Sequence, residues 1–356
     1  MVMVSLNYVK SEGIMSTVSI RKTTGDDYAA IKAAVDQVIA DIGGIEDIIK
    51  PGYKVIIKPN LVACPTDRLS GGVTRWEVCL AIYEAVKALG AEPVIAESSA
   101  AGADTELTIA KCGYQELRDK GIPVIDLKQK ENARCTVEIE DGEVFKKINT
   151  WELVRDADAI ITVPVMKTHD QTEVTLGMKN LKGLLVDTQK KDFHKKGLIE
   201  GVVDWNLHLK PCLEIIDGTY GQQGLGPIFG ETIEGVASRF KRSSEVEIEG
   251  IPASFNLIFS KDACTGCHNT VISSLMDMKA QDLFPYLENM NVCVGPVTED
   301  MLPADANADN TVCIGVCCKK LADAKGFRWV VGCPPGNADV VKGILGDRKE
   351  YGVRYN

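Results

Sequence analysis

Short apolar runs alternate with helical patterns from Lys54 onward, and this alternation limits the fold more than any other feature. The runs have the length of buried strands and lie at residues 55–57, 93–96, 123–126 and 159–163. Helical patterns occur at residues 75–89 and 104–120. In a strand–helix–strand unit, the helix connects two strands that pair in parallel. We therefore expect an α/β fold. Its sheet should be mostly parallel, with helices on both faces.

Local signals add three narrower expectations. Thr74 and Glu77 match a capping box, so the Thr74 side chain should cap the helix that follows. Residues 218–230 contain five glycines and one proline, a composition that predicts a loop. Residues 1–14 show no regular pattern, and we expect them to be a loose extension.

Length and charge limit the class of protein. The chain has 356 residues, which favours a domain at residues 16–250 and a smaller α/β unit at residues 251–356. The formal charge of -10 argues against a general nucleic-acid binder and against a polybasic membrane binder. No apolar run approaches the roughly 20 residues that cross a bilayer, and no secretory signal is recognisable. We therefore expect a cytoplasmic protein without a membrane span.

Cysteine is unevenly distributed. Seven of the twelve cysteines fall in the last 93 residues. These seven are Cys264, Cys267, Cys293, Cys313, Cys317, Cys318 and Cys333. In a reducing compartment, such a concentration favours metal or thiol chemistry over structural disulfides.

Three groups of these cysteines follow apolar, strand-like runs. Cys264 and Cys267 lie between such a run and an amphipathic helix, where amide donors would stabilise sulfur anions. A second group lies at residues 313–318, and Cys333 precedes two prolines. If the strands are neighbours, their carboxyl ends bring the three groups to one point, and four thiolates could hold an iron–sulfur cluster. A zinc site, a redox dithiol and plain buried thiols remain as alternatives.

The order of these groups resembles the proximal-cluster module of nickel–iron hydrogenase small subunits and the related respiratory complex I subunit. The resemblance covers about the last 90 residues. It implies a [4Fe–4S] cluster held by Cys264, Cys267, Cys317 and Cys333. It gives no role to Cys313, and Cys318 stands where the module usually has a small residue.

Basic side chains gather at residues 163–183 of this acidic protein. Lys167, His169, Lys179 and Lys182 lie there, directly after the most apolar of the predicted strands. Such a local excess at the end of a strand indicates an anion site. The segment from Lys58 to Asn60 would lie at the same edge of the sheet.

The N-terminal part resembles the DUF362 family of uncharacterised proteins, which often occur with iron–sulfur domains. The resemblance spans roughly residues 20–280 and names no reaction. The segments that carry it are 57–61, 97–99, 163–169, 177–183, His194, 216–218 and 224–227. Family members usually have an aspartate-containing segment where this chain has Cys264 and Cys267, so the cysteine site would be built into the family scaffold.

Two sets of site residues follow. We predict catalytic roles for Lys167, His169, Lys179 and His194, because histidine titrates near neutral pH and lysine binds carboxylate or phosphate. We predict cofactor- or ligand-binding roles for Lys58, Asn60, Asn180 and Asp217. The alternative for the first set is a solvated loop, and Asp217 could instead cap a turn.

Three functions remain open. The first is an iron–sulfur redox protein that exchanges electrons with a small anionic substrate or a redox partner protein. The second is a non-redox isomerase or lyase in which lysine and histidine do acid–base work and the metal is structural. The third is a thiol- or zinc-held binding module with no chemistry of its own.

Overall fold

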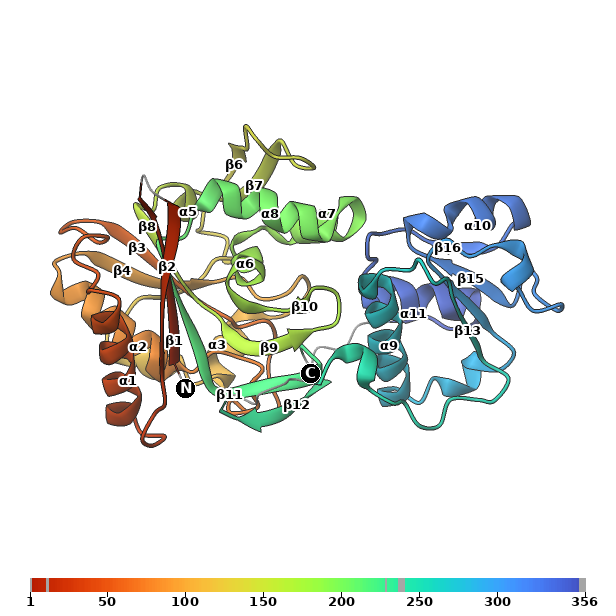
Figure 1. The fold of residues 1–356 in the computed structure, drawn as a ribbon, viewed down its shortest axis with the longest axis horizontal. Helices are drawn as coiled ribbons and strands as arrows, with labels where there is room; N and C mark the ends of the chain where they lie inside the picture. The colour runs from red at the N-terminus through yellow and green to blue at the C-terminus, as the bar shows by residue number, and fades with distance from the viewer. Residues whose placement is uncertain (1, 11–12, 228, 236–240, 352–356) are drawn as a thin grey trace.

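A computed structural model describes residues 2–10, 13–227, 229–235 and 241–351. Figure 1 shows a larger N-terminal body and a smaller C-terminal body side by side. A ten-stranded sheet forms the centre of the first and a four-stranded sheet the centre of the second. Within the described ranges, no helix is both long and apolar enough to cross a membrane.

The large sheet is parallel at its centre and antiparallel at its margins. Its strands are β1 (Val2–Lys10), β2 (Gly13–Arg21), β3 (Lys54–Pro59), β4 (Glu92–Glu97), β5 (Val124–Asp126), β8 (Ala159–Val163), β9 (Val165–His169), β10 (Glu173–Val174), β11 (Leu213–Leu225) and β12 (Phe229–Glu234). The main order is β10-β9-β11-β8-β3-β4-β5. All pairs from β9 to β5 are parallel, whereas β1, β2, β10 and β12 pair antiparallel. A separate hairpin joins β6 (Arg134–Glu138) to β7 (Lys147–Trp151).

Helices cover both faces of this sheet. They are α1 (Tyr28–Asp41), α2 (Trp76–Ala88), α3 (Thr105–Lys111), α4 (Gln115–Asp119), α5 (Glu152–Arg155), α6 (Leu176–Asn180), α7 (Asp187–Lys196) and α8 (Leu198–Leu209), with the 3-10 helix η1 (Leu181–Leu184) after α6. Neighbouring residues of one strand enter different cores: Ile57 packs with α1 and α2, whereas Ile56 packs with Trp205 of α8. Successive side chains of a strand point to opposite faces of the sheet. A strand whose side chains are all apolar therefore needs a covering layer on each face. The predicted fold class is therefore confirmed.

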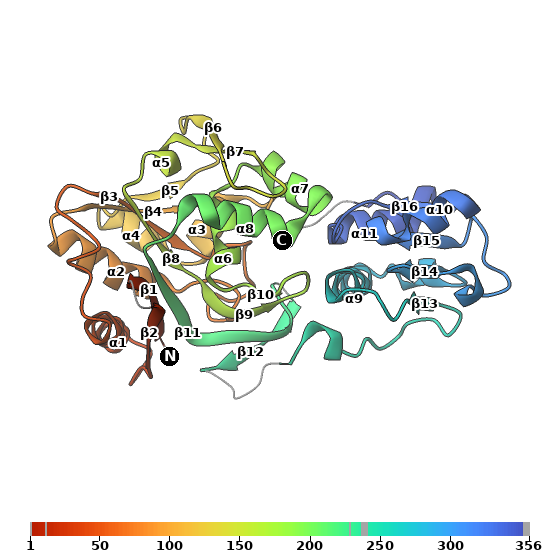
Figure 2. The ribbon, with the colours of Figure 1, turned by 45° about the horizontal axis from the view of Figure 1, so that its top comes forward.

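The C-terminal sheet is parallel throughout. Its order is β13 (Asn256–Phe259), β14 (Asn291–Val294), β15 (Thr311–Ile314) and β16 (Arg328–Val330). On one face lie α9 (Thr265–Ala280) and α11 (Asn337–Leu345), and on the other lies α10 (Lys319–Lys325), after the 3-10 helix η5 (Val316–Cys318). Figures 1 and 2 both show α9 and α11 on the side that faces the N-terminal body.

Two predictions about helices were wrong. The Thr74 hydroxyl does not cap α2, because it accepts a hydrogen bond from the Asn60 amide (2.8 Å) and donates one to the Val163 carbonyl (2.7 Å). Thr74 therefore ties two strand ends together. The single helix expected at residues 104–120 is two helices, separated at Gly113, whose φ is +81°.

Two segments expected to be irregular contain strands. The glycine-rich segment after residue 217 continues β11 as far as Leu225 and turns back as β12. Glycine is needed in this segment for close packing: a Cβ on Gly226 would lie 2.0 Å from the carbonyl oxygen of Thr168. At the N-terminus, β1 pairs with both β2 and β11, so the expected loose extension is mostly a strand.

A lysine- and histidine-rich candidate site beside four cysteines

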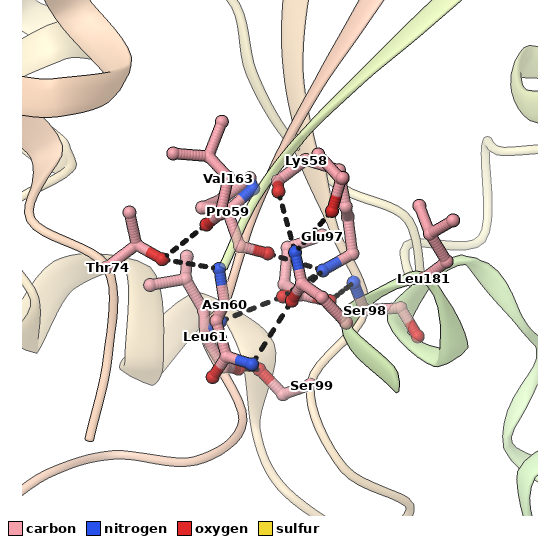
Figure 3. Close-up of polar contacts among 12 residues, drawn as sticks. Lys58, Pro59, Asn60, Leu61, Thr74, Glu97, Ser98, Ser99, Val163 and Leu181 are labelled. Carbon is pink, nitrogen blue, oxygen red and sulfur yellow. Dashed lines mark hydrogen bonds and ion pairs between the residues drawn. The ribbon is translucent and has the colours of Figure 1, made fainter. Parts of the chain in front are cut away.

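A buried ion pair lies where β3 and β4 end. Lys58 Nζ is 2.7 Å from Glu97 Oε2, and the two side chains are 1% and 4% exposed (Figure 3). The same carboxylate oxygen accepts the amide of Leu61 at 2.9 Å. Burial lowers the pKa of Lys58, and the Glu97 charge opposes that shift. The pair fixes the loops that leave the two strands.

Two asparagines connect this pair to the next strands. Asn60 Nδ2 donates to Asn180 Oδ1 (3.1 Å), and Asn180 Nδ2 donates to the Lys58 carbonyl and the Thr162 hydroxyl, both at 3.0 Å. Both asparagines are buried. The structure thus brings together three of the four residues predicted to bind a cofactor or ligand, and each of the three also holds the edge of the sheet together.

The fourth, Asp217, has its carboxylate oxygens engaged by the chain itself. It accepts the amide of Arg75 (2.9 Å) and both the amide (3.0 Å) and the hydroxyl (2.7 Å) of Thr219. Its side chain is buried, and burial raises its pKa. These contacts match the turn-capping alternative.

Lys167 is buried without an acidic partner. Its Nζ donates to Asn60 Oδ1 (3.0 Å) and to the Gly72 carbonyl (2.6 Å), and no described carboxylate forms an ion pair with it. Burial, with a contribution from the nearby Lys179 charge, lowers the pKa of Lys167 to about 7. An ammonium in this position is stabilised mainly by uncharged oxygens, so a bound anion would complete its environment.

His169 lies between an acid and a lysine. Its Nδ1 is 2.9 Å from Asp170 Oδ1, and its Nε2 is 3.0 Å from Lys179 Nζ. Burial lowers the pKa of His169 to about 4 and that of Lys179 to about 8. The imidazole is therefore neutral at pH 7. The Gln171 amide donates to the same Nδ1 atom at 3.0 Å, and the tautomer of the ring sets whether Nε2 accepts a hydrogen bond from Lys179.

His194 pairs with a lysine to which we had assigned no role. Lys182 Nζ is 2.6 Å from His194 Nε2, and burial lowers the pKa of both groups well below their ordinary values. The Nδ1 atom of His194 has no hydrogen-bond partner among the described residues. Lys190, also not predicted, is buried and donates to the carbonyls of Ser98 and Ser99. The basic composition of residues 163–183 was a signal for Lys182, but Lys190 looked like an ordinary helical residue.

The first two cysteines of the predicted cluster lie at the start of α9. Cys264 is the N-cap and is exposed, whereas Cys267 is 6% exposed. A hydrogen bond from the Cys267 thiol, helped by the backbone amides of Cys267 and Gly266, lowers the pKa of Cys264 to about 5. This end of the helix therefore favours a thiolate.

The other two predicted ligands lie at the same edge of the C-terminal sheet. Charges on Cys333 and Cys317 both contribute to the raised pKa of Cys267, whose main cause is its hydrogen bond to Cys264. A Cβ on Gly315 would lie 2.9 Å from the Cys267 sulfur, so the turn after β15 touches that thiol. In the part of the chain that is described, no three or more His, Cys, Asp or Glu side chains are grouped as a single metal ion requires.

The remaining C-terminal cysteines point into the core. Cys293, Cys313 and Cys318 are each at most 1% exposed and belong to one apolar cluster with Leu321 and Phe327. The Cys318 thiol donates to the carbonyl of Cys293 at 3.6 Å. Cys313 and Cys318, for which the sequence offered no role, thus serve packing.

Main-chain hydrogen bonds join the cysteine edge to the lysine and histidine site. The Cys333 amide donates to the carbonyl of His194 (3.1 Å), and the Leu198 amide donates to the carbonyl of Cys333 (3.2 Å). Gln171, two residues after His169, donates from Nε2 to the carbonyl of Pro335 at 2.6 Å. The carboxyl edges of the two sheets therefore meet at this junction.

A cavity of about 150 Å³ lies elsewhere, near the amino ends of β8 and β11. It is lined by Ile160, Trp205, His208 and Cys212 among others, and it contains none of the predicted site residues. We place the candidate site at the carboxyl edge of the sheet, where ligands of parallel sheets bind, because charge and buried polar groups converge there.

The fold and site define an α/β protein with a buried lysine and histidine cluster beside a cysteine-rich parallel sheet. Residues 55–239 match DUF362, a domain of unknown function, and the chain belongs to that family. A similar protein is the thylakoid-associated protein sll1697 of Synechocystis sp., 27% identical over 231 residues, which are 62% of this chain and 68% of the relative. The cytoplasmic location remains a prediction.

Among solved structures, one similar chain is the lactate racemase apoprotein from Thermoanaerobacterium thermosaccharolyticum. It is 12% identical, with a TM-score of 0.38, and the match covers 81% of this chain and 73% of that one. A likeness at this level carries no argument about the reaction of this chain.

Proposed function

We propose that this chain is an iron–sulfur redox protein with a [4Fe–4S] cluster on Cys264, Cys267, Cys317 and Cys333. Electrons would pass between the cluster and a small anion bound by the lysines and histidines. The observation that carries the proposal is the pair of main-chain hydrogen bonds between Cys333 and α7–α8, at His194 and Leu198. Because of these bonds, a redox centre on the cysteines would lie directly beside the buried cations.

The donor set suits such a cluster. Four thiols come from three turns at the carboxyl edge of one parallel sheet, and four cysteine thiolates are the usual ligands of a [4Fe–4S] cluster. The lowered pKa of Cys264 supplies a thiolate near neutral pH. When bound, the cluster would supply one-electron transfer.

The chain's own side chains would bind and orient the substrate. Lys167 and Lys179 can each present an ammonium to a carboxylate or phosphate. The neutral imidazole of His169 can accept a proton and is oriented by Asp170. Because Lys167 and His169 are buried, their interaction with an anion is strengthened by the low local dielectric.

A second candidate function is acid–base catalysis without redox chemistry, as in an isomerase or lyase. The observation in its favour is the pKa of Lys167, which at about 7 matches the pKa of an efficient general base at neutral pH. In that case the metal on the cysteines would be structural.

Anaerobic purification with iron and acid-labile sulfide analysis tests the proposal. We expect about four irons per chain and a broad visible absorption that dithionite bleaches. Cys333→Ser should lose most of the iron, whereas Cys293→Ser, which changes a buried thiol outside the ligand set, should retain it. One zinc and no iron in the wild type would refute the redox proposal and favour a structural metal. A metal-free chain would favour a dithiol.

A further inference from the structure

Exposed apolar side chains surround the cysteine edge. Val316, directly before Cys317, is 43% exposed, and Val331, two residues before Cys333, is 46% exposed. Ile199, 56% exposed, follows the residue whose amide binds the Cys333 carbonyl. Single exposed apolar residues are ordinary, but several around one site mark a contact surface.

The same surface continues along α8. Val203 and Leu207 follow Ile199 at intervals of four residues, so the three side chains share one face of the helix. They are 41% and 48% exposed. Met178, half exposed, extends this stripe, because its carbonyl accepts a hydrogen bond from Asn206 of α8 at 3.0 Å.

Lysines border this apolar surface. The segments that contain or adjoin the cysteine edge carry more exposed lysines than exposed acids. The lysines are Lys195, Lys196, Lys261, Lys319 and Lys320, and the acids are Glu200, Asp262 and Asp323. Lys319 shares its charge with Asp323 at 2.5 Å. Around the cysteines, a chain of formal charge -10 therefore presents a locally positive rim.

We propose that this cysteine face, formed by the apolar stripe and its lysine rim, docks a small acidic electron-transfer protein. The proposal rests on the redox function proposed above. An apolar centre with a charged rim is the usual composition of a protein interface, and redox encounters use small ones. If a cluster is bound on the four cysteines, it would take up the one electron that leaves the reduced iron–sulfur centre of the partner. No bond forms or breaks and no proton moves.

Charge complementarity selects this occupant. An acidic partner is attracted by the lysine rim, whereas a second copy docked through the same face would set lysines against lysines, and a basic redox protein would be repelled. The exposed Cys264 and Cys317 lie within the face, so a docked centre would have a short path to them.

Binding of oxidised, acidic plant-type ferredoxin to the anaerobically purified protein tests the inference. Isothermal titration calorimetry at low salt should show a saturable complex. The double variant Lys195→Glu with Lys320→Glu should weaken it about tenfold, and the difference should disappear near 1 M salt, where the Debye length is about 3 Å. Lys87→Glu is the matched control, because Lys87 and Lys195 are both exposed lysines in the last turn of a helix.

The apolar stripe needs its own variant. Ile199→Gln should weaken binding at every salt concentration, because it removes apolar contact and not charge. The rate at which reduced ferredoxin bleaches the visible absorption should fall in both sets of variants, while bleaching by dithionite should be unchanged.

Three results would overturn the proposal. They are unchanged ferredoxin affinity in the double variant, preferential binding to vesicles of anionic lipid, and a concentration-dependent dimer that Ile199→Gln dissociates. Iron and sulfide analysis of the same samples shows whether a negative result contradicts the docking surface or the proposed iron–sulfur cluster. A wild-type chain without iron that still binds ferredoxin through these lysines would refute electron transfer but support the docking surface.

Discussion

Lys58 and Glu97 form an ion pair that is almost completely buried, between the ends of two parallel strands. The carboxylate also accepts the amides of Leu61 and Ser98, so its charge is compensated from two sides. Such a pair need not add net stability, but each member becomes costly when the other is removed.

Lys58→Met and Glu97→Gln should therefore each lower the free energy of unfolding by about 3–5 kcal/mol. The double variant Lys58→Met with Glu97→Gln should lose less than the sum of the single variants, because no uncompensated charge remains. Urea denaturation followed by circular dichroism measures all three. Additive losses would mean that the two side chains act independently.

The pKa of Lys167 predicts a dependence of stability on pH. Burial lowers that pKa from 10.5 to about 7, so between these values the unfolded chain holds a proton that the folded chain does not. The contribution of Lys167 to the free energy of unfolding thus rises with pH from about 7 to 10.5 and is constant below. Lys167→Met should flatten this slope, as measured by denaturation at several pH values. An unchanged slope would contradict the lowered pKa, and the exposed Lys87→Met serves as control.

Gly315 gives a test of contact with the cysteines. Its φ is +84°, and an added Cβ would lie 2.9 Å from the Cys267 sulfur. Gly326 has a similar φ of +69° but nothing within 4 Å. Both changes to alanine should cost about 1–2 kcal/mol of backbone strain, and Gly315→Ala should cost more and also lower the iron content. Equal stability and equal iron content in the two variants would mean that the turn does not touch the site.

A contact between the two bodies can be tested at Asn337. Its Nδ2 donates to Asp170 Oδ2 at 3.0 Å and to the Ser273 hydroxyl at 2.9 Å. Asn337→Ala leaves a buried carboxylate oxygen without this donor and should cost about 1–3 kcal/mol, measured by thermal or urea unfolding. Gln37→Ala, which removes an exposed amide bonded to Asp41, should change stability by less than about 0.5 kcal/mol. If Asn337→Ala loses no more stability than Gln37→Ala, the contact between the two bodies contributes little to the free energy of unfolding.

The central strands β3, β4, β5 and β8 of the large sheet could be predicted because they carry a signal in consecutive residues. Ile56 and Ile57 point to opposite faces and are both buried, which only a strand between two layers permits. Strand β11 could not be predicted in the same way. Its glycines resemble those of a loop, and the need for glycine directly after it, at Gly226, comes from the backbone of Thr168 in a distant segment.

The candidate site was predicted only in part, for a similar reason. The basic residues between Lys167 and Lys182 are consecutive enough to reveal an anion site. Their burial, which lowers their pKa values, and their contacts with distant residues are not visible in the sequence. Asp170 meets Asn337 across 167 positions, and Lys182 meets His194 across 12. The cluster on four cysteines, its ligand set and the hydrogenase-like resemblance stay predictions.

The hydrogen bonds of Cys333 to His194 and Leu198 involve only backbone atoms. Substituting the side chain of His194 or Leu198 therefore removes no donor or acceptor from this contact between the two bodies. A lineage of such proteins could exchange the histidine, and with it the chemistry of the anion site, while keeping the same mutual orientation of its two halves.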